Sequence, residues 1–96
     1  QQIYKNLAVN VLVPGQFYFM QGEVKGPGRY VLVSGLTVTR AIAAAGGYTD
    51  YARQGKIQIN RGNRVLWING SEAEKRPEKD LPIEAGDVIR VHRSWL

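Results

Sequence analysis

The chain has 96 residues, 44% of them hydrophobic and 22% charged, which is the composition of one globular domain. It has no cysteine, so disulfide frameworks and thiolate metal sites are excluded, and no apolar run approaches the roughly 20 residues of a membrane-spanning helix. The net charge of +5 favours acidic partners, although it also fits a surface that is merely well solvated.

The N-terminal part predicts a frayed end and then two apolar segments. Residues 1–8 are expected to fray. Valines alternate with other residues over 9–13, which predicts a strand, and Pro14 with Gly15 predicts a turn after it. Residues 17–20 read Phe-Tyr-Phe-Met and are apolar on both faces. Such a run is typical either of a central strand covered on both sides or of a strand with one face in an interface.

A hairpin is expected next. Gly26, Pro27 and Gly28 predict a tight turn, because proline presets φ and the flanking glycines tolerate a positive φ. Residues 30–33 read Tyr-Val-Leu-Val, and this aromatic and β-branched run predicts the return strand.

One amphipathic helix follows the hairpin. Thr37 is placed to cap its first turn, because a hydroxyl can accept a hydrogen bond from the free amides there. Gly46 and Gly47 are expected to end the helix, with a positive φ at one of them. The spacing i, i+3, i+4, i+7 predicts an apolar stripe of Val38, Ala41, Ile42 and Ala45.

Residues 48–55 are interpreted as a loop, and residues 56–69 as a second hairpin. Gly62 and Asn63 form a two-residue turn signal between two alternating runs. The register centred on this turn pairs residues that share a face. One face is then wholly apolar and consists of Ile57, Ile59, Leu66 and Ile68. The opposite face consists of Gln58, Asn60, Val65 and Trp67.

The last third of the chain predicts a loop and a closing strand. Residues 71–80 are interpreted as a charged loop, residues 81–83 as a return to the core, and Gly86 with Asp87 as a turn. Residues 88–91 read Val-Ile-Arg-Val and predict the closing strand. The order of strands, one helix and more strands predicts an α+β fold with the main helix on one face of a mixed or antiparallel sheet. A β-grasp fits this order, whereas a ferredoxin-like fold requires a second helix that the pattern does not show.

The inventory of reactive side chains predicts no enzyme. His92 is the only imidazole and is interpreted as a solvated residue near the end of the chain. The carboxylates Glu72, Glu74 and Glu78 are interpreted as a solvated loop. No catalytic, cofactor-binding or metal-binding residue is therefore assigned. No nucleic-acid partner is expected, because aromatic and basic residues do not interleave into a groove.

The predicted register places Trp67 and Val65 on the side of the second hairpin that faces away from the core. An outward Trp beside an outward Val needs cover, either from this chain through Phe17, Tyr18 or Trp95, or from a partner. Aromatic and arginine side chains suit a contact surface. The candidate interface or ligand-binding set is Trp67, Val65, Arg64, Gln58, Tyr51 and Arg53.

Several short motifs occur in a characteristic order over nearly the whole chain. They are Gly22-Glu23-Val24, Gly26-Pro27-Gly28-Arg29-Tyr30, Leu36-Thr37 ahead of Ala41-Ile42, Ala45-Gly46-Gly47-Tyr48-Thr49 with Ala52, Ile57-Gln58-Ile59-Asn60-Arg61 and Gly86-Asp87-Val88-Ile89-Arg90-Val91. This series resembles the soluble-ligand-binding β-grasp domain, in particular the copies in Wza-like polysaccharide export proteins of the bacterial outer membrane. The resemblance implies a β-grasp domain over residues 9–92, between the segment 1–8 and a tail at 93–96 where a longer chain was cut. It implies no catalytic residue.

The resemblance also implies a function and a location. We expect a non-enzymatic domain of a capsule or exopolysaccharide export apparatus, in the periplasm and associated with the outer membrane. Its expected role is ring assembly or interdomain contact, with glycan contact as a further role. The expected partners are other copies or domains of the same export protein, envelope assembly partners and polysaccharide. The alternative is a small-ligand binding module in another envelope or redox complex.

Overall fold

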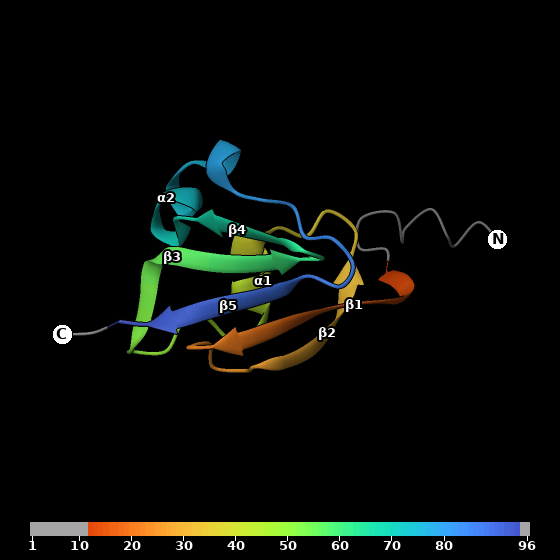
Figure 1. Ribbon diagram of the computed structural model, residues 1–96, viewed down its shortest axis with the longest axis horizontal. Coiled ribbons are helices and arrows are strands. Elements are labelled where there is room, and N and C mark those ends of the chain that lie inside the picture. The colour runs from red at the N-terminus through yellow and green to blue at the C-terminus, as the bar shows by residue number, and fades with distance from the viewer. Residues whose placement is uncertain (1–11, 95–96) are drawn as a thin grey trace, which may run out of the picture.

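The computed structural model describes residues 12–94 and contains a five-stranded mixed sheet (Figure 1). Its strands are β1 (Leu12–Gly22), β2 (Gly28–Val33), β3 (Ala52–Arg61), β4 (Arg64–Ile68) and β5 (Val88–Arg93). They lie in the order β2-β1-β5-β3-β4. The last strand therefore lies at the centre of the sheet, parallel to β1 and antiparallel to β3.

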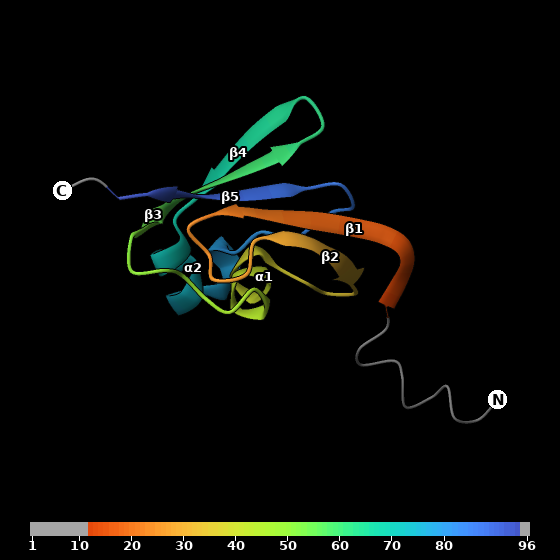
Figure 2. The same cartoon turned by 90° about the horizontal axis from the view of Figure 1, so that it is seen from below.

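Helical segments cover one side of this sheet. They are α1 (Val38–Ala44), α2 (Gly70–Lys75) and the short 3-10 helix η2 (Pro77–Lys79). Figure 2 shows α1 and α2 on the same face, with the other face of the sheet open. The predicted α+β class and mixed sheet are confirmed, and the arrangement is β-grasp-like.

The helix α2 corrects the expectation of a charged loop at residues 71–80 and of a single helix. Asn69 precedes this helix, and its side-chain oxygen accepts a hydrogen bond from the amide of Glu72 at 3.0 Å. This is the cap that an Asn-x-x-Glu spacing supplies. Only Gly70 and Ala73 of the helix are buried. A helix this short has no room for an apolar stripe, so hydrophobic periodicity could not reveal it.

The core lies between α1 and the inner face of the sheet. The predicted stripe of α1 is buried, as are Ile57 and Ile59 of β3, and Leu66 and Ile68 of β4 pack against the same cluster. The predicted register of the second hairpin is confirmed, since Ile57 pairs with Ile68 and Ile59 with Leu66. The core is completed by Tyr18, Met20, Val24, Leu32, Ile83, Ile89 and Val91.

The strand β1 differs from its prediction at Pro14 and Gly15. These residues were expected to form a turn, but the strand continues through them, with a register shift between Leu12 and Phe17. An irregularity of this kind bends a strand without ending it, and Gly15 supplies a φ of 75°. The predictions for residues 1–8 and 9–11, and for Trp95 as a cover, concern residues outside those that the structure describes.

The strand β3 also begins earlier than predicted, because Ala52 already pairs with Arg93 of β5. A second register shift, between Ala52 and Ile57, interrupts the alternation of the intervening residues. The interpretation of residues 48–55 as a loop is therefore wrong from Ala52 onward.

The two ends of α1 were predicted with different success. Gly46 and Gly47 have φ values of 93° and 89°, and the amide of Gly47 donates to the carbonyl of Ile42 at 2.9 Å, so the glycine stop is confirmed. Thr37 does occupy the N-cap position, but its side chain makes no capping hydrogen bond. Its hydroxyl is buried without a partner among the described residues, so the capping role is wrong.

The predicted glycine turns lie between strands. Gly26, Pro27 and Gly28 lead from β1 into β2, and the hydroxyl of Tyr30 donates to the carbonyl of Gly26. Gly86 has a φ of 86° in the turn before β5, and Asp87 follows it with its side chain fully buried.

Candidate functional site

The face of the sheet opposite α1 and α2 is open, and we call it the outer face. Residues of β1 alternate in exposure, with Tyr18 and Met20 in the core and Phe19 37% exposed. The first of the two alternatives for residues 17–20, a strand covered on both sides, is therefore wrong within this chain. The other large apolar side chains that are exposed are Val31 at 43%, Tyr51 at 57%, Val65 at 53% and Trp67 at 48%.

The strand registers divide the outer face into two parts. One row of paired residues crosses all five strands and consists of Arg29, Phe19, Val88, Asn60 and Val65. The next pair on the same face toward the N-terminus of β1 is Phe17 with Val31. We call the apolar residues of this part the apolar band: Phe17, Phe19, Val31, Val65 and Val88.

The second part lies around Trp67, toward the C-terminal end of β5. The indole stacks on the ring of His92, with centroids 5.8 Å apart and an angle of 27° between the planes. Lys56 Nζ lies 4.7 Å from the indole centroid. Gln58, opposite Trp67 on β3, holds the imidazole in place, because its Oε1 lies 2.6 Å from His92 Nε2. Gln58 in turn donates from Nε2 to Asn60 Oδ1 at 2.8 Å.

A small cavity of about 170 Å³ opens beside Trp67, and we call it the Trp67 pocket. Its lining consists of Arg53, Lys56, Trp67, His92 and Arg93. Arg93 also lies over the ring of Tyr51, with the guanidinium carbon 4.5 Å from the ring centroid. The pocket therefore combines aromatic surface with several cationic groups.

Charge is segregated in this fold. None of the five described strands contains an Asp or a Glu, whereas they carry seven Lys or Arg residues. Six of these seven have no ion-pair partner among residues 12–94, and the exception is Arg61. The unpaired six are Arg29, Arg53, Lys56, Arg64, Arg90 and Arg93.

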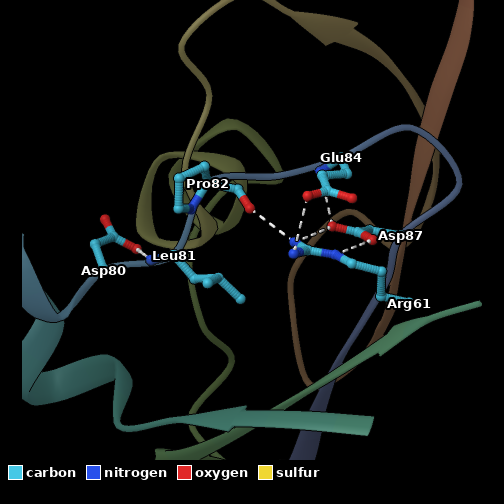
Figure 3. Close-up of polar contacts among 6 residues, drawn as sticks. All are labelled: Arg61, Asp80, Leu81, Pro82, Glu84 and Asp87. Atoms are coloured by element: carbon cyan, nitrogen blue, oxygen red, sulfur yellow. Dashed lines mark hydrogen bonds and ion pairs between the residues drawn. The ribbon is translucent and has the colours of Figure 1, made fainter. Parts of the chain in front are cut away.

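Arg61 belongs to a structural cluster rather than to the cationic surface (Figure 3). Its guanidinium donates to both carboxylate oxygens of Asp87, at 3.0 and 2.8 Å, to the carbonyl of Pro82 at 2.8 Å and to Glu84 at 3.2 Å. The hydrogen bond to Asp87 is the main cause that raises the pKa of Arg61. The turn role predicted for Asp87 therefore omits its larger role as the buried partner of a cation.

A second concavity of about 430 Å³ lies between the helical segments. Asp80 accepts hydrogen bonds there from the hydroxyl of Thr39 at 2.5 Å and from the amide of Leu81 at 2.9 Å. Thr37 also lines the cleft, and its buried hydroxyl has no hydrogen-bond partner among the described residues. Its lining consists of Thr37, Thr39, Arg40, Ala43, Ala73, Glu74, Pro77 and Asp80.

Two kinds of feature are missing from the part of the chain that the structure describes. No three His, Cys, Asp or Glu side chains gather there into a group that could hold a metal ion. No helix among these residues is long and apolar enough to cross a membrane.

The structure brings most of the predicted interface residues together. Trp67, Val65 and Gln58 lie on the outer face, as the register predicts, and Arg53 lines the Trp67 pocket. Tyr51 is next to the pocket through its contact with Arg93. Arg64 begins β4 at the hairpin turn, away from the pocket lining.

Sequence reasoning missed His92, Lys56 and Arg93 as parts of this site. The interpretation of His92 as a solvated residue near the chain end is wrong, because β5 continues through it and its ring packs on Trp67. The face on which His92 lies could have been predicted, since continuing the alternation beyond Val91 places His92 on the same face as Arg90. Its contact with Trp67 depends on β5 lying next to β3, which no local pattern shows.

Comparison with known proteins gives one family. A search of curated proteins finds no match. Residues 17–74, which are more than half of the chain, match the SLBB domain family. This match includes the first hairpin, α1, the second hairpin and part of α2. The chain therefore belongs to the SLBB domain family.

Proposed function

We propose that this chain is a non-enzymatic contact domain of a bacterial capsule or exopolysaccharide export apparatus, in the periplasm at the outer membrane. SLBB domains are found in polysaccharide export and related proteins, which supports this setting. In the proposal, the outer face packs against another copy or another domain of the same export protein. The observation that carries it is the apolar band on a face that no helix covers.

The physical reason is the composition of the apolar band. A sheet with one solvated face normally alternates apolar residues inside with polar residues outside. Here Phe19, Val31 and Val65 are each more than a third exposed on the outer face. Phe19 and Val31 lie on the adjacent strands β1 and β2, whereas Asn60 of β3 separates Val65 from Val88. Apolar surface of this kind, bordered by arginines, is typical of a protein contact site.

The test uses Val65→Ser and Trp67→Ala in the full-length export protein. Both side chains are about half exposed, so we expect each variant to lose about 1 kcal/mol or less of folding stability. Loss of a fully buried Trp would instead cost roughly 3–5 kcal/mol. We expect a nearly unchanged thermal midpoint together with a smaller assembly in sedimentation velocity.

The matched control is Ala44→Ser, an exposed position of α1 on the opposite side of the sheet. It is expected to leave both the midpoint and the assembly unchanged. Intact assembly of Val65→Ser and Trp67→Ala, or a large loss of stability in either, would rule out the contact function.

The second candidate is a small-ligand binding module, and the cleft between the helical segments supports it. A concavity of about 430 Å³ falls within the usual range of small-molecule sites. Thr37 lines it, and the buried hydroxyl of this residue lacks a partner among the described residues. A thermal-shift screen with a metabolite library tests it. The expected hit raises the midpoint of the natural chain but not that of Thr37→Val, and an empty screen rejects this candidate.

A further inference from the structure

The Trp67 pocket has an unbalanced charge. Arg53, Lys56 and Arg93 line it together with the imidazole of His92, and no carboxylate is among the lining residues. None of the three cations forms an ion pair within residues 12–94. Gathered like charges repel each other, so such a site attracts an anionic group.

The cations of this pocket are held at its surface by aromatic rings. Lys56 lies over Trp67 and Arg93 over Tyr51, at 4.7 and 4.5 Å from the ring centroids. Contacts of this kind are favourable at exposed sites and restrict the long side chains. The charged groups are therefore partly ordered before any ligand arrives, which lowers the entropy cost of binding one.

The pocket is also small. Its volume of about 170 Å³ is below the roughly 300–1,000 Å³ of drug-sized sites. It has room for one ring or one acidic group, not for a large cofactor. The indole at its border is 48% exposed and offers an apolar surface next to the cations.

We propose that the Trp67 pocket binds the carboxylate of an acidic saccharide, with the sugar ring against the exposed part of the indole. The proposal rests on the proposed function and names a ligand for one end of the outer face, while the apolar band serves protein contact. An arginine guanidinium can hold a carboxylate with two parallel hydrogen bonds, and the Lys56 ammonium adds a point charge.

A nucleic acid is the competing polyanion, and the geometry favours it less. Binding of single strands uses a row of aromatic side chains on which successive bases stack. Beside this pocket His92 packs against the half-exposed indole, and Arg93 lies over the other exposed ring, that of Tyr51. These rings therefore do not form a row of free stacking surfaces. A single sugar ring needs only one such surface.

The experiment titrates the chain of 96 residues with tetragalacturonate in about 0.15 M salt, where long-range charge effects are screened. The matched probe is the fully methyl-esterified tetramer, which has the same rings without the charges. Binding is followed by NMR at the indole N–H of Trp67, assigned with Trp67→Phe. We expect the acidic tetramer to shift this signal and to bind at least about tenfold more tightly than the ester, as loss of charge-assisted hydrogen bonds predicts.

Two charge variants locate the site. Lys56→Gln and Arg93→Gln should each weaken binding by about three- to tenfold. The control is Arg76→Gln, which removes the same charge from an exposed position after α2, on the other side of the sheet. It should bind tetragalacturonate like the natural chain. Circular dichroism checks that all three remain folded, and the comparison of acid with ester on the natural chain needs no variant.

Three results would overturn the proposal. The first is equal binding of acid and ester, and the second is an equal loss of affinity in Arg76→Gln and Lys56→Gln. The third is tighter binding of a single-stranded oligonucleotide of the same charge. The proposed function fails separately, because Val65 is outside the lining of the Trp67 pocket and the assembly of Val65→Ser, unlike that of Trp67→Ala, tests the contact function alone. If Val65→Ser weakens assembly but the natural chain does not bind tetragalacturonate, the contact function stands and the ligand proposal fails. If tetragalacturonate binds but Val65→Ser assembles normally, only the contact function fails.

Discussion

Tyr48 shows how burial acts on a single residue. Its hydroxyl is enclosed and has no hydrogen-bond partner among the described residues. Burial raises the pKa of Tyr48 from its ordinary value of 10.0 to about 12, and the charges of Glu74 and Asp80 add to the rise. The hydroxyl lies against Gly70, the first residue of α2, where any Cβ would collide with it. Gly70 is therefore required for close packing of α2 on the ring.

Tyr48→Phe removes the unpartnered hydroxyl and keeps the ring. We expect stability at neutral pH to stay equal or to rise by up to about 1 kcal/mol, because a buried group without a partner is removed. In the natural chain, ionisation is harder in the folded state than in the unfolded state. The stability contributed by the neutral hydroxyl is thus fully present below about pH 10 and is lost as the pH rises through about 12.

Urea unfolding at neutral pH and at several alkaline values measures this difference. The variant should lose less stability than the natural chain over the alkaline window. A variant that is destabilised by more than about 2 kcal/mol at neutral pH would show that the hydroxyl has a partner.

At the scale of elements, the pair of Arg61 and Asp87 joins the end of β3 to the turn before β5. Asp87 is fully buried and also accepts a hydrogen bond from the amide of Glu84 at 2.8 Å. The guanidinium carries a further bond to the carbonyl of Pro82, so one side chain holds the segment between η2 and β5 against the sheet (Figure 3). Backbone hydrogen bonds also attach this segment, from Ile83 N–H to the carbonyl of Leu36 at 2.9 Å and from Gly86 N–H to the carbonyl of Phe17 at 2.7 Å. The cluster adds a side-chain attachment to them.

Asp87→Asn is predicted to cost about 3 kcal/mol, because it removes the buried counter-charge of a mostly buried guanidinium and leaves only the exposed carboxylate of Glu84. The control is Arg64→Gln on the adjacent strand, which is exposed and should change stability by no more than about 0.5 kcal/mol. Urea unfolding at neutral pH compares the two. Equal stability of the two variants would show that the pair does not hold the segment.

The elements themselves differ in how much of them local sequence reveals. The second hairpin is specified by its own residues, since a slip by one position would expose Ile57 and Ile59. The helix α2 is specified mainly by one cap at Asn69, a signal that competes with the turn tendency of Asn-Gly. The rest of α2 is rich in charged side chains. Such side chains are solvated in a loop as well as on a short helix, so the composition did not indicate a helix.

On the scale of the whole molecule, the sheet separates two environments. The helical side carries both signs of charge, with Glu72 and Glu74 near Lys75 and Arg76. The strands carry basic residues alone, and Arg29, Lys56 and Arg90 among them pair with or contact residues of the outer face. The described strands therefore contribute only positive charge to the outer face, which favours the acidic ligand proposed for the Trp67 pocket.

The sequence by itself determined the α+β class, the first hairpin, the α1 stripe with its glycine stop, and the outward direction of Trp67 and Val65. These follow from periodicity and turn chemistry, which act between residues close together in the chain. Only the tertiary structure decided that β5 lies between β1 and β3. That position puts His92 against Trp67 and Asp87 against Arg61, pairs at least 25 residues apart in sequence. Strand order depends on how all faces are buried together, and no local pattern encodes it.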